Sequence, residues 1–230
     1  MTLGDKLEKI KEKVSLIQEK VGIENSVEIV AVTKTHPFQI IKDSYNAGFF
    51  SIGENRVQEA ISKFQSFESM PKLNKRFIGH LQSNKVKKCI NIFDTIDSVD
   101  SLKLLKKIAK EAKSKEKEIP VLLEVNTSKE PQKKGFSSVE LDSILSCFYV
   151  KNVKIEGLMT MAPFTDEKKV IRKAFIELRR LKEKINNQTN NNKVVELSMG
   201  MSNDYEIAVE EGSTMIRLGT SLFGQRGPLK

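Results

Sequence analysis

The stretch VEIVAVTKTHP, residues 27 to 37, decides both the fold and the site predicted for this chain. Residues 27 to 32 are mostly apolar β-formers, which is typical of a buried strand, and Pro37 favours the start of a helix. Lys34 is therefore expected where a buried strand leaves the core. Burial lowers the pKa of a lysine, and a neutral lysine amine can form a Schiff base with an aldehyde. The alternative is a lysine that has simply reached solvent after the strand ends.

Strand-like and helix-like segments alternate along the rest of the chain. Strands are predicted at residues 27–32, 49–53, 76–81, 90–97, 119–126, 153–159, 193–198 and 213–219. Helices are predicted at residues 39–47, 54–67, 83–89, 100–117, 138–147, 166–185 and 203–211. An additional amphipathic helix comes first, with apolar residues at helical spacing: Leu7, Ile10, Val14 and Ile17. This pattern predicts an α/β fold, a single (β/α)8 TIM-like barrel over residues 1–230 with an extra N-terminal helix. An open doubly wound sheet is the alternative.

The composition excludes several classes of function. No apolar run approaches the roughly 20 residues of a membrane helix, and the charged N-terminus is not a signal peptide, so we expect a cytoplasmic protein without a membrane partner. Cys89 and Cys147 have no CxxC partner, which fits a reduced chain without a metal site. The formal charge of +9 comes from lysines interleaved with glutamates. That pattern is typical of solvated helix faces and does not favour nucleic-acid binding.

Polar residues follow the predicted strands, at the end where barrels of this type carry their chemistry. In chain order they are Lys34, Glu54 with Asn55, His80, Asp97, Asn126, Thr160, Ser198 with Ser202, and Arg217 with Gly219 and Thr220. Structural alternatives exist for some of them, since His80 could be a satisfied core histidine and Asn55 could cap the next helix. Glu54 and Asp97 could act as an acid–base pair, although no spacing singles them out.

The segment SMGMSND, residues 198 to 204, leads into a short predicted helix. Gly200 lets the backbone approach a ligand, Ser202 offers a hydroxyl group, and the start of a helix offers free N–H groups. Together these features indicate an anion site that is best suited to phosphate. The alternative is a helix cap formed by Ser202 or Asn203.

Arg217 lies in the apolar segment MIRLGT and therefore requires a buried acceptor, which could also be a structural salt bridge. Gly219 and Thr220 add backbone N–H groups and a hydroxyl group just beyond it. In many barrels the loops after strands seven and eight form a phosphate site. A Schiff-base lysine, a phosphate site and an arginine in one cavity match the setting of pyridoxal 5′-phosphate.

Six motifs carry a resemblance to a known family: AVTKTHP, SIGEN, FIGHLQSNK, GLMTM, LSMGMSND and GSTMIRLGTSLFG. They resemble the pyridoxal phosphate homeostasis proteins, and the match runs from about residue 29 to residue 224. That family is similar to the barrel domain of alanine racemase and of ornithine-type decarboxylases. The resemblance implies that Lys34 holds pyridoxal 5′-phosphate as a covalent internal aldimine. It further implies that Asn55 contacts the cofactor and that His80 lies nearby. The phosphate would be bound by Ser202, Gly219 and Thr220. The pyridine nitrogen would face Arg217.

A second lysine is implicated in cofactor exchange in that family, and Lys133 matches it. This chain departs from the pattern there, because Pro131 precedes Lys133 and Lys134 stands beside it. Which of the two lysines takes that role therefore stays open.

A racemase needs a base on each face of the substrate Cα proton. In the related racemases the second base is a tyrosine of a C-terminal β-domain, which we expect to be missing here because the chain ends at Lys230. Tyr45, Tyr149 and Tyr205 all fall in predicted helices. Arg217 cannot accept a ring proton, which weakens carbanion chemistry.

We therefore expect a monomeric homeostasis protein without catalytic residues, which buffers pyridoxal phosphate or delivers it to apo-enzymes. The alternatives are a racemase- or decarboxylase-like enzyme with weak activity, and a Schiff-base aldolase acting on a phosphorylated sugar. The aldolase would be colourless, and borohydride would trap its Lys34 only when substrate is present.

Overall fold

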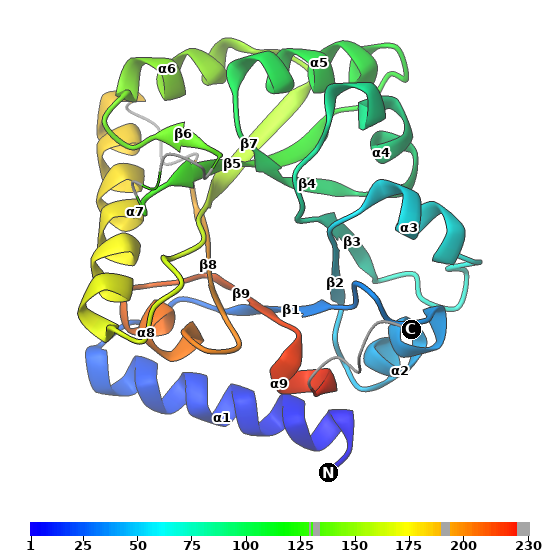
Figure 1. Ribbon diagram of the computed structural model, residues 1–230, viewed down its shortest axis with the longest axis vertical. Coiled ribbons are helices and arrows are strands. Elements are labelled where there is room, and N and C mark those ends of the chain that lie inside the picture. Colours follow the sequence, from blue (N-terminus) through cyan, green and yellow to red (C-terminus); the bar gives the residue numbers. More distant parts are fainter. Residues whose placement is uncertain (129, 131–133, 190–193, 225–230) are drawn as a thin grey trace.

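A computed structural model describes residues 1–128, 130, 134–189 and 194–224, and Figure 1 shows it along the axis of its central barrel. Within these residues, eight parallel strands form the barrel wall. They are β1 (Glu28–Val32), β2 (Ser51–Glu54), β3 (Asn74–Phe77), β4 (Thr95–Val99), β5 (Ile119–Asn126), β7 (Val153–Met159), β8 (Glu196–Met201) and β9 (Met215–Leu218). Their order is β4-β3-β2-β1-β9-β8-β7-β5, and the pairing of β4 with β5 closes the ring. The predicted (β/α)8 barrel is confirmed, and the open doubly wound sheet is wrong.

The helices surround this barrel (Figure 1). They are α1 (Leu3–Val21), α2 (Phe38–Asn46), α3 (Val57–Lys63), α4 (Val86–Ile92), α5 (Leu102–Lys113), α6 (Leu141–Leu145), α7 (Lys168–Thr189), α8 (Tyr205–Glu210) and α9 (Thr220–Phe223). Two 3-10 turns, η1 (Ser83–Lys85) and η2 (Ser146–Tyr149), precede α4 and follow α6. A two-residue strand, β6 (Phe136–Ser137), pairs with the end of β5.

The predicted N-terminal helix is confirmed as α1. Thr2 caps it, because its hydroxyl group accepts a hydrogen bond from the Asp5 N–H and the Asp5 carboxylate accepts one from the Thr2 N–H. The four apolar residues of its pattern are buried against β1, β9 and α8: Leu7, Ile10, Val14 and Ile17. This helix therefore covers the outside of the barrel next to the strand that carries Lys34.

Two predicted strands are displaced in the structure. β3 spans residues 74 to 77 instead of 76 to 81, and β4 begins at Thr95 instead of residue 90. Residues 90 to 92 instead continue α4, whose Cys89 and Ile90 are buried at adjacent helical positions. Asp97 therefore lies inside β4 and does not follow it, so its predicted position at a strand end is wrong.

The lower half of the barrel interior is filled. Arg76 on β3 lies 2.9 Å from the Glu28 carboxylate and 3.1 Å from the Asp97 carboxylate. An apolar cluster from four strands joins this network: Val30, Leu122, Met159 and Met215. Because these side chains occupy the barrel below, the space that remains lies at the C-terminal ends of the strands, where such barrels carry their sites.

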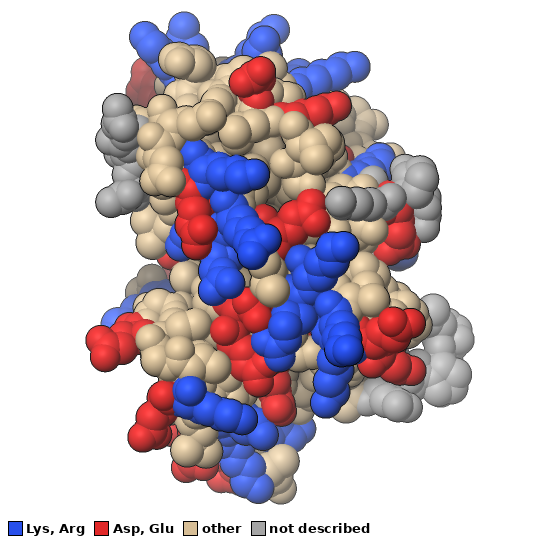
Figure 2. All heavy atoms as spheres, turned by 90° about the vertical axis from the view of Figure 1, so that its left-hand side faces the viewer, with Lys and Arg blue, Asp and Glu red and all other residues tan. Residues whose placement is uncertain are grey.

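Charges of both signs are mixed on the face that is formed largely by α7 (Figure 2). Arg172 and Arg179 on this helix pair with Glu210 and Glu211 at the end of α8. These pairs join charges of both signs on that side of the molecule. Of the helices in the described part of the chain, none is long and apolar enough to span a membrane.

Candidate functional site

A cavity of about 1190 Å³ opens at the C-terminal ends of the barrel strands. All seven residues that the family resemblance implies as cofactor contacts line it: Lys34, Asn55, His80, Ser202, Arg217, Gly219 and Thr220. They come from five different strands or the segments after them, and only the closed barrel brings them together. Glu54 and Asp97 do not line this cavity, because Lys63 and Arg76 hold their carboxylates elsewhere. The structure therefore does not support an acid–base pair formed by Glu54 and Asp97.

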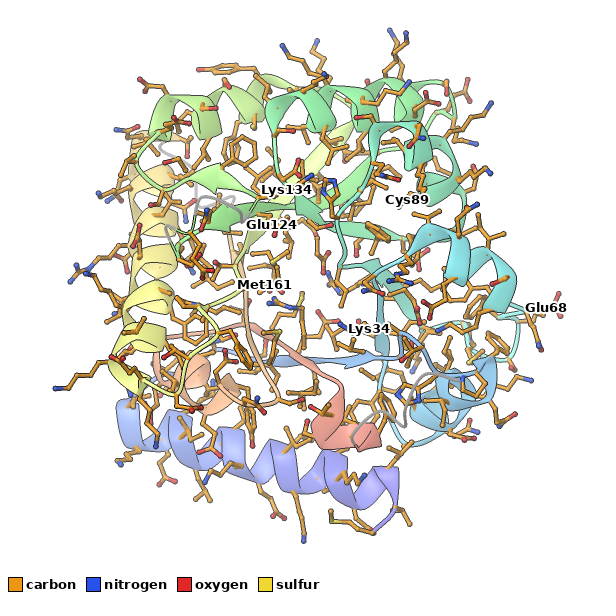
Figure 3. All side chains as sticks on the ribbon, viewed as in Figure 1. Lys34, Glu68, Cys89, Glu124, Lys134 and Met161 are labelled. Atoms are coloured by element: carbon orange, nitrogen blue, oxygen red, sulfur yellow. The ribbon has the colours of Figure 1, made fainter. Side chains whose placement is uncertain are left out.

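Lys34 stands two residues beyond β1 and is half-buried. Figure 3 shows its side chain directed into the barrel opening, with Glu124 and Lys134 on the far side. Lys34 therefore lines the cavity and does not point away from the barrel opening. An amine in this position is accessible to a ligand in the cavity but is partly shielded from water.

The predicted anion site is formed by the segments after β8 and β9. The Ser202 hydroxyl oxygen accepts hydrogen bonds from the backbone N–H groups of Gly219, at 3.3 Å, and Ser221, at 3.2 Å. Gly200 has φ +97°, and a Cβ atom there would lie 2.6 Å from the Ala208 side chain, so this turn requires glycine. A hydroxyl group and several N–H groups therefore converge on one edge of the cavity, where a phosphate group can accept hydrogen bonds from them.

The alternative in which these polar residues cap helices is wrong at the N-terminus of α8 and at the N-terminus of α3. The N-cap of α8 is Asp204, so neither Ser202 nor Asn203 occupies that position. Asn55 likewise does not cap α3, whose N-cap is Arg56. The Asn55 Oδ1 atom is instead buried, and no residue in the described part of the chain forms a hydrogen bond with it. A buried amide oxygen without a donor fits a ligand group that supplies one.

Arg217 is buried below the cavity. Its guanidinium group donates hydrogen bonds to the Ser198 hydroxyl group, at 2.6 Å, and to the Thr160 carbonyl oxygen, at 2.8 Å. Burial lowers the pKa of Arg217, whereas nearby carboxylates, first that of Asp97, raise it. An arginine remains charged in proteins, so the floor of the cavity carries a fixed cation that donates hydrogen bonds and accepts none. Within the described ranges no carboxylate forms a salt bridge with it, so the alternative of a structural salt bridge is wrong.

Glu124 on β5 is a cavity residue that sequence reasoning missed. Its burial raises the pKa of the carboxyl group to about 7, with a smaller contribution from Asp100, whereas Arg217 and Lys134 lower this pKa. A signal for it exists in the sequence, because Glu124 is the one charged residue of IPVLLEVN and lies two residues before Asn126, on the same face of the strand.

The cavity mouth carries a chain of three polar side chains. The Nζ atom of Lys134 lies 2.8 Å from Nε2 of His80, and Nδ1 of His80 lies 3.1 Å from the Asp100 carboxylate. Because lysine only donates, Nε2 of His80 accepts and Nδ1 carries the proton that Asp100 binds. His80 is exposed, so the alternative of a core histidine is wrong. Of the two candidate exchange lysines, Lys134 lines the cavity, and Lys133 lies outside the described residues.

The described residues thus fit a phosphorylated aldehyde. They offer an amine, an N–H-rich edge and a fixed cation around one cavity. No group of three or more histidine, cysteine, aspartate or glutamate side chains in the described part of the chain is arranged to hold a metal ion.

Comparison with known proteins agrees with this interpretation of the fold. Residues 6–227 match the family model of the alanine racemase N-terminal domain. The alanine racemase of Clostridium difficile 630 superimposes with a TM-score of 0.71 at 17% identity, covering 98% of this chain and 57% of that one. The protein is therefore a barrel of the alanine racemase type.

Two proteins of similar length narrow the assignment. The pyridoxal phosphate homeostasis protein of Aquifex aeolicus is 36% identical over 228 residues, which covers 98% of this chain and 99% of the relative. The structure of PipY from Synechococcus elongatus with pyridoxal phosphate bound superimposes with a TM-score of 0.84 at 33% identity, covering 97% of this chain and all of that one. The chain belongs to the family of pyridoxal phosphate homeostasis proteins.

Proposed function

We propose that this protein binds pyridoxal 5′-phosphate in the barrel cavity, holds it as a covalent aldimine of Lys34, and buffers or delivers it inside the cell. The observation that carries the proposal is the convergence of Lys34, the Ser202 anion site and Arg217 on one cavity. The names of the relatives and the ligand of PipY support the same ligand. When bound, the cofactor supplies an aldehyde that condenses with a primary amine, with loss of one water molecule, and a phosphate that accepts hydrogen bonds.

Each side of the cavity has a separate task in this proposal. The hydroxyl groups of Ser202 and Thr220 would bind the phosphate group, joined by the N–H of Gly219, which donates to the Ser202 hydroxyl oxygen in this structure. The buried amide oxygen of Asn55 would accept a hydrogen bond from the ligand. His80 lies at the mouth, where it orients the ammonium group of Lys134. The phosphate contacts supply affinity without chemistry, so they hold the ligand whether or not Lys34 has reacted.

Arg217 is the first reason why we propose weak or no catalysis of amino-acid reactions. Its guanidinium group would hold the ring side of the cofactor, and because a guanidinium has no lone pair to accept a proton, it would not stabilise a protonated pyridine ring. A neutral ring withdraws electrons poorly, and carbanion chemistry is correspondingly slow. The hydrogen bonds that Arg217 donates to Ser198 and Thr160 fix the guanidinium group in place. A lysine variant there would lack this planar fork.

The tyrosine that serves as the second base in the related racemases has no counterpart among the cavity residues that the structure describes. Tyr45 lies on α2, Tyr149 is 88% exposed on η2, and Tyr205 lies on α8; none of the three lines the cavity. A racemase requires a base on each face of the substrate carbon. We therefore propose a carrier and not an enzyme of amino-acid metabolism.

The proposal includes a monomer in a reducing cytoplasm, with pyridoxal-phosphate-dependent apo-enzymes as recipients. Burial raises the pKa of the Cys147 thiol to about 12, and it raises the pKa of the Cys89 thiol as well. Both cysteines are therefore unreactive thiols, which fits that compartment. Light scattering on the purified protein tests the monomer.

The test of the carrier function is a transfer experiment. Protein loaded with pyridoxal phosphate and freed of excess ligand is mixed with an apo-aminotransferase, and the recovered aminotransferase activity is followed. We expect recovery to follow the amount of loaded protein. In parallel, the loaded protein is incubated with single amino acids, and racemised or decarboxylated products are measured. Steady turnover that is abolished in Lys34→Ala, without transfer, would replace the carrier by the enzyme alternative.

A further inference from the structure

A buried carboxylate and a buried ammonium group hold the backbone just before Lys34. The Nζ atom of Lys63, at the end of α3, donates to the Thr33 carbonyl oxygen at 2.9 Å and to the Glu54 carboxylate at 2.5 Å. The Thr33 hydroxyl group donates to the same Glu54 oxygen at 2.6 Å. The side chains of Lys63 and Glu54 are 7% and 0% exposed. Both the hydroxyl and the carbonyl group of Thr33 are therefore fixed.

The residue after Lys34 is held from the same helix. Thr35 has φ +66°, in the left-handed region that a β-branched residue rarely adopts. Its N–H group donates to the Glu59 carboxylate at 2.5 Å, and that carboxylate lies 3.7 Å from Nζ of Lys63. A strained residue keeps such a conformation only where its surroundings impose it. The backbone is therefore clamped on both sides of Lys34.

The buried ion pair of Glu54 and Lys63 contributes little to the free energy of folding. Burial raises the pKa of Glu54, and the charge of Lys63 opposes that change. The second Glu54 oxygen, Oε2, is buried and has no hydrogen-bond partner within the described residues. Removing an ion pair from water offsets most of its attraction, so a buried pair is weak evidence for stabilisation. What the pair does provide is a defined geometry for the segment that it holds.

We propose that the Glu54–Lys63 pair is a positioning element, which presents the amine of Lys34 to the cavity. Glu59 completes it by holding the strained Thr35. The inference rests on the proposed function for the identity of the ligand, but its subject is the rate at which Lys34 reacts and not the affinity of the phosphate site. Neither Glu54 nor Lys63 lines the cavity, so both act through the backbone of residues 33 to 35.

The test separates reaction at Lys34 from binding. Ligand-free protein is mixed with pyridoxal phosphate, samples are quenched with borohydride, which reduces the C=N bond to a secondary amine, and modified Lys34 is counted by peptide mass spectrometry. Affinity for pyridoxine 5′-phosphate, which has an alcohol in place of the aldehyde, is measured by calorimetry. In Lys63→Met we expect the rate of Lys34 modification to fall about ten- to a hundredfold, because small misplacements of a reacting group have effects of that size. The dissociation constant of the analogue should change less than about threefold, because no phosphate contact is removed.

Two further variants make the result decisive. Lys63→Met alone leaves Glu54 buried and unpaired, so a double variant, Glu54→Gln with Lys63→Met, removes both charges and still lacks the donor to Thr33. Lys107→Met, which removes the partly exposed 2.9 Å pair with Glu111 on α5, far from Lys34 in the sequence, is the matched control and should react like the wild type. A folded double variant that modifies Lys34 at the wild-type rate would overturn the positioning role alone. A wild type whose Lys34 stays unmodified would overturn that role together with the proposed function.

Discussion

Glu124 offers a direct test of the electrostatics of the cavity. It is 7% exposed, and burial raises its pKa from 4.5 to about 7. Between these two values the folded protein keeps a proton that the unfolded chain has released, so stability declines as the pH rises. Each pH unit in this window corresponds to about 1.36 kcal/mol, and the window spans about 2.5 units, which gives about 3 kcal/mol. The contribution is fully present below about pH 4.5 and is lost above about pH 7.

The variant Glu124→Gln has no carboxyl group that titrates at this position. Its free energy of unfolding should therefore not fall between pH 4.5 and pH 7 for this reason. We expect the difference in the free energy of unfolding between variant and wild type to grow by about 3 kcal/mol in favour of the variant from pH 4.5 to pH 8. Urea unfolding of both proteins across this range measures it. Glu118→Gln, at an exposed position just before β5, is the control and should differ from the wild type by less than about 0.5 kcal/mol throughout. A Glu124→Gln difference that stays constant with pH would refute the reasoning.

Three more predictions concern separate parts of the molecule. Ser202→Ala should weaken binding of pyridoxal phosphate about tenfold but leave that of pyridoxal, which lacks the phosphate, unchanged, as titration of each ligand would show; equal losses for both would contradict a phosphate site. Arg76→Met should reduce the free energy of unfolding by about 3–5 kcal/mol, because Asp97 is left buried without its partner, and an unchanged urea midpoint would argue against that pairing. Gly157→Ala should lower the melting temperature, since its Cβ atom would lie 2.2 Å from the Glu196 carbonyl oxygen; a wild-type melting curve would show that β7 and β8 can separate there at no cost.

The fold could be predicted because each barrel strand is a short apolar run separated from the next by a helical segment. The one large error, at β4, arose where two apolar stretches adjoin. Ile90, Ile92 and Phe93 are apolar, but residues 90 to 92 form the end of α4, Phe93 is its C-cap, and the strand begins only after Asp94. Periodicity cannot separate a helix end from a strand start when both are buried, because the same residue types serve both.

The positions of the cavity residues could be predicted because a closed barrel brings the C-terminal ends of all its strands to one face. Glu124 was missed because it lies inside β5, where its neighbours in the sequence are apolar, and only strand alternation places it on the inner face. The contacts around Lys34 were beyond sequence reasoning for a different reason. Lys63 reaches back to Thr33 only because α3 ends where it does, after seven residues, and the predicted helix ended at residue 67.

The central claim is that Lys34 holds pyridoxal phosphate covalently, and absorption spectroscopy tests it most directly. Spectra of the wild type and of Lys34→Ala are recorded before and after addition of pyridoxal phosphate. We predict a yellow band of the lysine Schiff base in the wild type, which is lost or strongly altered in the variant. A wild-type protein that stays colourless after the cofactor is added would contradict the claim.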